Sequence, residues 1–236
     1  MLEELNMLSN PKSRVAEAVK TIRTNLEFSL VNGGEKKIML TSTEPGEGKS
    51  FIAASLAQSY ALSGKKVLII DCDLRRGRQY EIFGVSNGKG LSNILISDLS
   101  GVKIETIKTK LKGVYLLPSG TVPPNPSELL ESKRMGKLID MLENNYDIII
   151  FDCPPVVGLS DALVVTKYVS TTVIVTAYKQ TSEDMLKKTV KALEGVNAHI
   201  AGVILNKVPA TKNGYYNKYY DAYYGKAMAL KQRIAA

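Results

Sequence analysis

The stretch Thr41-Ser42-Thr43-Glu44-Pro45-Gly46-Glu47-Gly48-Lys49-Ser50 decides the fold of this chain. An apolar run at 38–40 precedes it and an apolar, helix-like stretch at 51–62 follows it, which gives the order strand, glycine-rich loop, helix. At Gly46 and Gly48 the backbone N–H groups can turn inward and surround an anion at the start of the helix. The stretch therefore predicts a phosphate-binding loop in an α/β domain.

The pattern gives each position of this loop a chemical role. Lys49 supplies a point charge for the β- and γ-phosphates of a nucleotide, and the Ser50 hydroxyl is placed to hold Mg²⁺. The usual pattern begins with glycine at position 43, where this chain has Thr43, and a surface turn that happens to precede a helix is the alternative. We expect nucleotide contacts from Glu44, Pro45, Gly46, Glu47, Gly48, Lys49, Ser50 and Phe51.

Two further apolar runs end in carboxylates. Residues 66–70 lead to Asp71 and Asp73, and residues 146–151 lead to Asp152. Continuous apolar runs are typical of parallel strands buried on both faces, and ligands of such sheets lie beyond the carboxyl ends of the strands. Each aspartate could instead cap a helix. The three together, beside a phosphate-binding loop, are expected to converge on it.

Composition favours one large domain. The chain has 236 residues, of which 44% are hydrophobic, and no shift in composition divides it. No apolar run approaches the roughly 20 residues of a membrane-spanning helix, and the first residues lack the features of a signal peptide; we expect a cytoplasmic protein. Cys72 and Cys153 form no C-x-x-C pair and favour small buried side chains, while the single His199 argues against histidine-based catalysis.

Strand-like and helix-like segments alternate along the rest of the chain. Strands are expected at 114–118, 170–178 and 199–208, and helices at 91–96, 161–168, 182–194 and from Ser127, as the capping residue, to about Asn144. This alternation predicts a P-loop NTPase-like α/β fold, with a mostly parallel sheet and helices on both faces. We assign residues 1–210 to this domain and 211–236 to a flexible tail.

Residues 13–31 predict an amphipathic helix. Glu17, Lys20 and Arg23 share one of its faces, which is either a solvated charged face or an interface. The apolar stripe consists of Val15, Val19, Ile22, Leu26 and Leu30.

The net charge of +8 raises the possibility of a nucleic-acid or anionic membrane partner. Residues 211–236 hold five lysine or arginine residues against one aspartate, so much of the excess lies there. The basic stretch at 75–78 is phosphate-facing, partner-facing or solvated. Asn206 ends the last expected strand, where it is either a nucleotide base contact or part of a turn.

Six of the twelve tyrosines fall within residues 214–225. Their recurrence every four residues fits a helix packed on a core, but this segment contains no aliphatic residue larger than alanine. Tyrosines among lysines could also stack on single-stranded nucleic acid. A third possibility is a substrate segment for phosphorylation, where each phosphate would add about −1.5 to −2 charge. The six residues are Tyr215, Tyr216, Tyr219, Tyr220, Tyr223 and Tyr224.

Nearly the whole chain resembles the cytoplasmic catalytic proteins of bacterial tyrosine kinases that regulate capsular and exopolysaccharide synthesis, in the form whose membrane adaptor is a separate chain. The resemblance includes residues 17–26, the glycine-rich loop and both acidic strand ends. Its most specific pieces are the tyrosine cluster and Val122-Pro-Pro-Asn-Pro-Ser-Glu-Leu-Leu130.

The resemblance implies roles for individual residues in an ATP- and Mg²⁺-dependent tyrosine autokinase. Lys49 would bind phosphate, while Ser50, Asp73 and Asp152 would hold Mg²⁺ and its waters. Asp71 would orient the incoming tyrosine hydroxyl or accept its proton. The six tail tyrosines would be modified, in trans between subunits.

Partners also follow from the resemblance. Glu17, Lys20 and Arg23 resemble the motif with which unphosphorylated subunits form a ring, although the family usually has arginine in place of Lys20. Gly77 stands where the family often has proline. We further expect a membrane adaptor of the polysaccharide co-polymerase type that recruits the chain to the inner face of the plasma membrane, a cognate phosphotyrosine phosphatase, and no nucleic acid.

The main alternative is an ATPase of the partition and division-site-positioning class, which uses the same sheet and acidic strand ends. That class resembles K-G-G-x-x-K-[ST] in its loop. The position of its signature lysine is Glu44 in this chain.

Overall fold

The structure is a computed structural model that describes residues 13–29, 37–97 and 104–209. The chain divides into two units, residues 1–206 and 207–236. The fold described below is that of the first unit. Residues 210–236, with all six tyrosines of the predicted tail, lie outside the described residues, as does Leu30 of the predicted apolar stripe.

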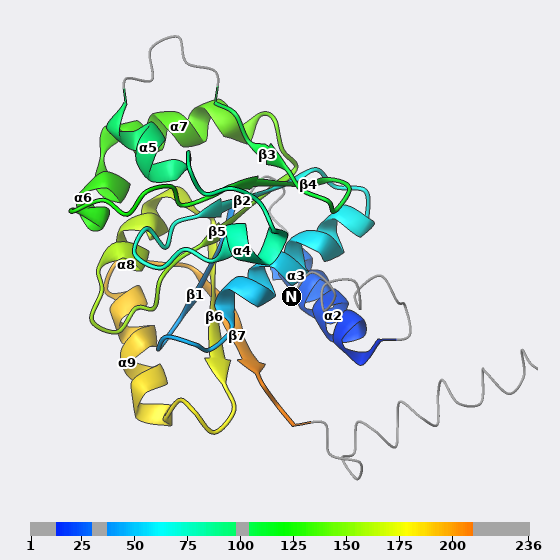
Figure 1. Cartoon of the computed structure of the whole chain (residues 1–236). Coiled ribbons are helices and arrows are strands. Elements are labelled where there is room, and N and C mark those ends of the chain that lie inside the picture. The colour runs from blue at the N-terminus through cyan, green and yellow to red at the C-terminus, as the bar shows by residue number, and fades with distance from the viewer. Residues whose placement is uncertain (1–12, 30–36, 98–103, 210–236) are drawn as a thin grey trace, which may run out of the picture. The chain divides into compact units, whose positions relative to one another are not determined.

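A sheet of seven strands forms the centre of the first unit (Figure 1). Its order is β3-β4-β2-β5-β1-β6-β7, and every neighbouring pair is parallel except β3 and β4, which are antiparallel. The predicted α/β fold with a mostly parallel sheet is thus confirmed. The strands are β1 (Lys37–Ser42), β2 (Val67–Asp71), β3 (Ile107–Lys108), β4 (Val114–Leu117), β5 (Ile148–Asp152), β6 (Thr171–Ala177) and β7 (Ile200–Asn206).

Register brings the acidic strand ends together. Strands β2 and β5 are adjacent, and Asp71 pairs with Asp152 at their carboxyl ends. On the other side of β5 lies β1, whose carboxyl end runs into the glycine-rich loop. Because the strands are parallel, the loop and both carboxylates emerge at the same edge of the sheet.

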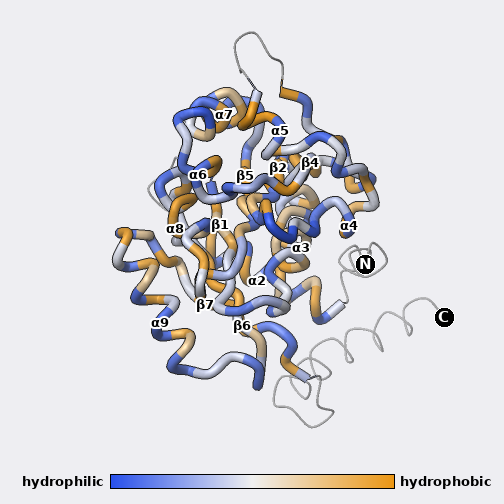
Figure 2. The backbone as a smooth tube through the Cα atoms, turned by 60° about the vertical axis from the view of Figure 1, so that its left-hand side comes forward, coloured by the Kyte–Doolittle hydropathy of each residue, from blue (hydrophilic) through white to orange (hydrophobic). Residues whose placement is uncertain are grey.

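Helices cover both faces of the sheet. On one face, α2 (Arg14–Ser29), α3 (Lys49–Leu62) and α4 (Gln79–Phe83) bury their apolar residues in one hydrophobic cluster. The other face has a second cluster, and hydrophobic and hydrophilic residues alternate along α7 and α9 that pack there (Figure 2). The helices of this face are α5 (Leu91–Ile96), α6 (Pro126–Glu131), α7 (Lys133–Glu143), α8 (Asp161–Val165) and α9 (Glu183–Glu194), with a 3-10 turn, η2 (Thr166–Tyr168), after α8.

The single helix predicted from Ser127 to Asn144 is wrong in two respects. Ser132 has an extended backbone (φ −62°, ψ 151°) and separates α6 from α7. Ser127 is not a capping residue, because α6 already begins at Pro126, and the Ser127 hydroxyl donates instead to the carboxylate of Asp161. A side chain far away in the sequence thus competes successfully for this hydroxyl.

The predicted apolar stripe of α2 is only partly buried. Val19 and Leu26 are 3% and 5% exposed and pack in the core, as expected. The prediction for Val15 is wrong, since it is 45% exposed. Val15 lies in the first turn of the helix, where the neighbouring Ala16 packs against the core cluster instead.

The two edges of the sheet differ. Two-residue β3 forms one edge, while seven-residue β7 forms the other and leaves Val203 and Leu205 46% and 54% exposed. Neither β3 nor the short helix α4 was predicted. Among the helices of the described part of the chain, none combines the length and apolar character needed to cross a membrane.

Candidate functional site

The glycine-rich loop has the backbone shape of an anion-binding loop. Gly46 and Gly48 have φ values of 81° and 91°, in the left-handed region that favours glycine. Gly48 precedes α3 without any side-chain cap, so the first N–H groups of this 14-residue helix remain available to a ligand. Thr43 is not among the positive-φ residues of the described chain, which explains why the loop forms without glycine at that position.

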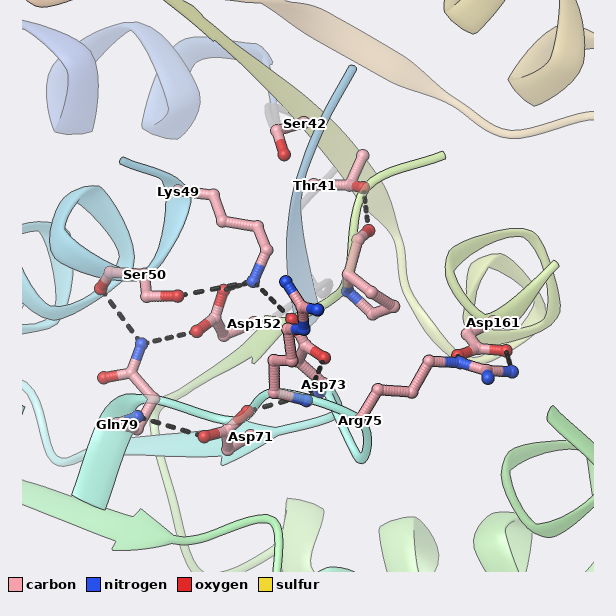
Figure 3. Close-up of polar contacts among 12 residues, drawn as sticks. Thr41, Ser42, Lys49, Ser50, Asp71, Asp73, Arg75, Gln79, Asp152 and Asp161 are labelled. Carbon is pink, nitrogen blue, oxygen red and sulfur yellow. Dashed lines mark hydrogen bonds and ion pairs between the residues drawn. The ribbon is translucent and has the colours of Figure 1, made fainter. Parts of the chain in front are cut away.

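Lys49 lies where the strand ends meet. Its Nζ atom is 3.1 Å from Oδ2 of Asp73, 3.3 Å from Oδ1 of Asp152 and 3.3 Å from the Ser50 hydroxyl oxygen (Figure 3). All three charged side chains are largely or fully buried. The structure therefore brings together the lysine, the hydroxyl and two of the carboxylates that the sequence singled out.

Asp71 completes the acidic group and is fully buried. Its Oδ1 accepts the main-chain N–H of Asp73 at 3.2 Å, and its Oδ2 accepts that of Gln79 at 3.0 Å. Each carboxylate oxygen retains a second lone pair that can accept a further proton. A Cβ atom at Gly77 would lie only 2.7 Å from Oδ2 of Asp71, so glycine permits this close approach.

Burial and charge shift the pKa values of this group. Burial raises the pKa of the Asp71 carboxyl well above its ordinary value, and the charge of Asp152 adds to the increase, while Lys49 partly offsets it. For Lys49, burial alone would lower the pKa, but the charges of Asp152, Asp73 and Asp71 outweigh it and raise the pKa. Lys49 is therefore a permanent cation, and Asp71 has an unusually high proton affinity for an aspartate.

Gln79 belongs to the site but was missed from the sequence. Its side chain is fully buried, and its Nε2 atom donates to Oδ2 of Asp152 at 2.7 Å and to the main-chain oxygen of Ser50 at 3.0 Å. Figure 3 shows the amide between the first turn of α3 and the carboxylate. No motif marks a lone glutamine after the basic stretch, so only the fold reveals its position.

The Glu47 side chain stabilises the glycine-rich loop. Its carboxylate is fully buried and accepts the main-chain N–H groups of Glu44 at 2.7 Å and of Ala177 at 3.2 Å, together with the Thr181 hydroxyl. The side chain of Glu47 thus acts on the loop itself, and the N–H of Glu44 is already engaged. Both residues were predicted to contact nucleotide; any contact by Glu47 would come from its main chain.

Asn206 also contacts the loop. Its Nδ2 donates to the main-chain oxygen of Glu47 at 2.9 Å, and a Cβ atom at Gly48 would lie 2.3 Å from the same nitrogen. Asn206 therefore holds the backbone of the predicted phosphate-binding loop, and its contact with a nucleotide base stays a prediction.

The basic stretch after β2 divides between two environments. Arg75 donates from Nε to Oδ2 of Asp161 at 2.7 Å, and Asp161 is fully buried. Arg78 is 64% exposed in its side chain and only approaches Glu81, at 3.6 Å. Arg75 pairs with α8 of its own chain while 41% of its side chain stays exposed, so it is partly solvated; phosphate-facing and partner-facing roles of the stretch stay predictions.

The three predicted oligomerisation residues of α2 lie in different surroundings. Lys20 and Glu17 are 60% and 33% exposed in their side chains and lie 3.7 Å apart. Arg23 is 15% exposed, and it donates from NH1 to the main-chain oxygen of Ser59 on α3 at 2.8 Å. Assembly through these residues stays a prediction.

The residues present fit a nucleotide with Mg²⁺. Within the described ranges, no group of three or more His, Cys, Asp or Glu side chains is arranged as a metal cage. Mg²⁺ is usually held by one or two carboxylates together with substrate phosphates and water. Ser50, Asp73 and Asp152 beside a phosphate-binding loop provide that incomplete set, and the two cysteines, both free and buried, do not take part.

Comparisons with known sequences identify relatives of this chain. Residues 35–201 match the AAA domain family. The putative tyrosine-protein kinase CapB of Staphylococcus aureus is 35% identical over 220 residues, which cover 93% of this chain and 96% of CapB. YwqD of Bacillus subtilis, also named a tyrosine-protein kinase, is 37% identical over 90% of this chain and 89% of its own. The chain spans only 30% of the tyrosine-protein kinase wzc of Salmonella typhimurium, at 35% identity over 93% of this chain.

Comparisons with solved structures identify relatives of the same kind. The kinase domain of the Escherichia coli tyrosine kinase ETK superposes with a TM-score of 0.80 at 36% identity, covering 89% of this chain and 84% of that one. The chimerical protein CapA2B2 gives 0.78 at 38% identity, covering 84% and 87%. The septum site-determining protein MinD of Pyrococcus horikoshii gives 0.61 at 24% identity over 79% and 76%, which shows a shared fold alone. Because relatives more than a third identical match nearly the full length of both chains, this chain belongs to the bacterial tyrosine kinase family.

Proposed function

We propose that this chain is a protein-tyrosine kinase that uses ATP and Mg²⁺ to phosphorylate its own C-terminal tyrosine cluster, in trans between subunits. The observation that carries the proposal is the convergence of two carboxylates on Lys49 at the end of the phosphate-binding loop, where Nζ lies 3.1 Å from Asp73 and 3.3 Å from Asp152. Asp71, with a raised pKa, lies in the same group.

The loop and α3 supply the binding part of the reaction. The N–H groups at the start of α3 and the ammonium of Lys49 would hold the phosphates, and Asn206, which contacts the loop backbone, would contact the base. Ser50, Asp73 and Asp152 would hold Mg²⁺, which when bound neutralises charge on the phosphate oxygens. Lys49 would then exchange its carboxylate partners for phosphate oxygens.

Asp71 has the properties needed for proton transfer. The phenol oxygen of a tyrosine forms a bond to the γ-phosphorus while the bond from that phosphorus to the β,γ-bridging oxygen breaks and ADP leaves. A phenol has a pKa near about 10 and keeps its proton at neutral pH, so the proton must pass to a base. The raised pKa of Asp71 makes it a better acceptor than an ordinary carboxylate.

The tail would connect this chemistry to regulation. Residues 214–225 hold the six candidate tyrosines, and each phosphate would add about −1.5 to −2 charge to a basic tail. Loss of a ring of subunits on phosphorylation, and restoration by a phosphotyrosine phosphatase, would follow from this change of charge. We infer that the process regulates capsular or exopolysaccharide synthesis and export.

A membrane adaptor of the polysaccharide co-polymerase type would bring the chain to the inner face of the membrane and order the site. The relative wzc is more than three times as long as the segment matched here, which supports the idea that further protein acts with this domain. Full activity of the isolated chain would contradict the need for an adaptor.

The experiment that tests this function measures the transfer of phosphate from ATP to tyrosine. The purified chain is incubated with ATP and Mg²⁺, with and without the cytoplasmic segment of an adaptor, and phosphorylated residues are mapped by mass spectrometry. We expect phosphate on Tyr215, Tyr216, Tyr219, Tyr220, Tyr223 or Tyr224 and its loss in Lys49→Met. Lys66→Met is a matched control, because Lys66 precedes β2 at the end away from Asp71 and is exposed.

Two further variants separate the steps. Asp71→Asn should still bind nucleotide but transfer no phosphate to tyrosine, and a chain lacking residues 214–225 should lose its own modification while it phosphorylates the tail of Lys49→Met. ATP hydrolysis without phosphotyrosine under either condition would instead favour an ATPase of the partition and division-site-positioning class.

A further inference from the structure

We propose that Gln79 is a positioning residue for the metal-binding side of this site. Its amide holds the Asp152 carboxylate and the first turn of α3 in a fixed relation, and its main-chain N–H holds Asp71. This inference rests on the proposed use of Mg²⁺ and nucleotide, and it assigns a role to a residue outside the loop and the acidic strand ends.

The amide uses both of its hydrogens within the site. Nε2 donates to Oδ2 of Asp152 at 2.7 Å and to the main-chain oxygen of Ser50 at 3.0 Å. An amide nitrogen carries two donors, so both are occupied. One side chain therefore bridges the residue that supplies a metal-binding hydroxyl and the residue that supplies a metal-binding carboxylate.

The two oxygens of Asp152 are held from different sides. Oδ1 lies 3.3 Å from Nζ of Lys49, and Oδ2 accepts from Gln79. A carboxylate with a partner on each oxygen cannot rotate without breaking one of these contacts. If Lys49 moves to a phosphate, Gln79 remains as the contact that keeps Oδ1 directed toward the metal position.

The backbone of Gln79 gives the bridge a rigid base. Its N–H donates to Oδ2 of Asp71 at 3.0 Å, and Gln79 is the first residue of α4. The same short helix buries Ile82 and Phe83, which are 2% and 0% exposed, in the core cluster. The position of the amide is thus set by core packing and not by a mobile loop.

A neutral donor suits this position. Asp71, Asp73 and Asp152 already place three carboxylates beside one lysine, so an acidic side chain here would add repulsion and a basic one would compete with the metal. Partners that orient metal-binding carboxylates typically change metal affinity by about 10–100-fold when they are removed. Loss of the Gln79 amide should therefore raise the Mg²⁺ concentration that nucleotide binding requires.

The experiment measures binding of a fluorescent ATP analogue to the full chain as Mg²⁺ is varied, and again in EDTA. In Gln79→Met, which keeps the length of the side chain and removes its donors, we expect the half-saturating Mg²⁺ concentration to rise about tenfold. Affinity for the nucleotide in EDTA should stay unchanged. Gln58→Met is the matched control, since Gln58 is also buried, at 3% exposure, on α3 but away from the carboxylates.

Several outcomes would overturn the proposal. These are an Mg²⁺ requirement that changes equally in both variants, nucleotide affinity lost equally with and without Mg²⁺, or wild-type affinity that does not depend on Mg²⁺ at all. If Gln79→Met fails to fold, Gln79→Asn serves instead, because its shorter amide cannot span both acceptors and should also raise the requirement; no rise would refute the idea. Absence of phosphotyrosine would reject the proposed kinase without affecting this binding test.

Discussion

Arg23 of α2 donates from NH1 to the main-chain oxygen of Ser59 in the last turn of α3, at 2.8 Å. Carbonyl groups in the last turn of a helix lack partners within the helix and favour a positive charge. Arg23 also lies 3.7 Å from Glu27 one turn along its own helix. The guanidinium that resembles part of a ring-forming motif is thus a tie between the first two helices of the described chain.

This contact predicts different results for two basic residues of α2. Arg23→Ala should lower the free energy of unfolding by about 1–3 kcal/mol, because a partly buried hydrogen bond from a charged group is lost. Lys20→Ala should leave stability unchanged, since its side chain is 60% exposed. Urea unfolding followed by circular dichroism measures both, and sedimentation compares their assembly. Equal stability of the two variants would show that Arg23 does not tie the helices.

Tyr60 gives a prediction for alkaline pH. Its side chain is 1% exposed, and within the described residues its hydroxyl has no hydrogen-bond partner. Burial raises the pKa of this phenol and the charge of Glu27 adds to the effect, while Arg23 partly offsets it. The neutral phenol is therefore favoured in the folded state. Its contribution to stability is present below the unfolded pKa, near about 10, and is lost as the pH rises through the folded value.

Tyr60→Phe should remove this pH dependence. We expect the variant to be about 1 kcal/mol more stable near neutral pH, because an unpaired buried hydroxyl is removed, and its advantage to grow at alkaline pH. Thermal unfolding across this range tests the sign. An advantage for the wild type that increases with pH would contradict the argument.

The ion pair between Arg75 and Asp161 predicts a loss of stability that exposed pairs do not share. In Arg75→Met the buried carboxylate of Asp161 would lose its cation, which should cost about 1–3 kcal/mol after allowance for the partial exposure of Arg75. Arg78→Met is the control three residues away, where the pair with Glu81 is exposed and its loss should be near zero. Chemical denaturation of the two variants should separate them clearly.

Glu47 should matter to nucleotide binding because its side chain holds the main chain of the glycine-rich loop. Glu47→Ala removes the acceptor for the N–H of Glu44 and Ala177 and for the Thr181 hydroxyl. We expect nucleotide affinity to fall by about tenfold as the loop loses its shape, an effect of roughly 1.4 kcal/mol. Glu44→Ala should bind nearly as the wild type does, because among the residues that the structure describes Glu44 contacts the loop through its main chain. Calorimetric titration with ADP measures both.

Local patterns predicted most of the architecture. Apolar runs ending in Asp71 and Asp152 indicated buried parallel strands, and the register between β2 and β5 places these residues side by side. The order strand, glycine-rich loop, helix located Lys49 and Ser50 because the loop geometry is local to ten residues. These features follow from short-range chemistry, and the sequence contains them fully.

The features that the sequence did not predict depend on contacts between residues far apart in the sequence. Ser127 has the composition of a helix cap, yet its hydroxyl binds Asp161, 34 positions away. Arg23 has the spacing of a surface charge, yet a carbonyl on the next helix binds it. Gln79 carries no pattern at all, since a single amide becomes part of a site only when three segments meet around it. Such partners are set by tertiary packing, which residue spacing does not encode.

The two sheet edges have a consequence for the handling of the protein. An uncovered strand edge with apolar side chains is a template on which other chains can add strands, and aggregation then begins there. Within the described part of the chain, β7 is the long edge and exposes Val203 and Leu205, whereas β3 has only two residues, one of them a lysine. Leu205→Lys or Val203→Thr should therefore increase solubility in concentrated samples, and substitutions in β3 should change it little.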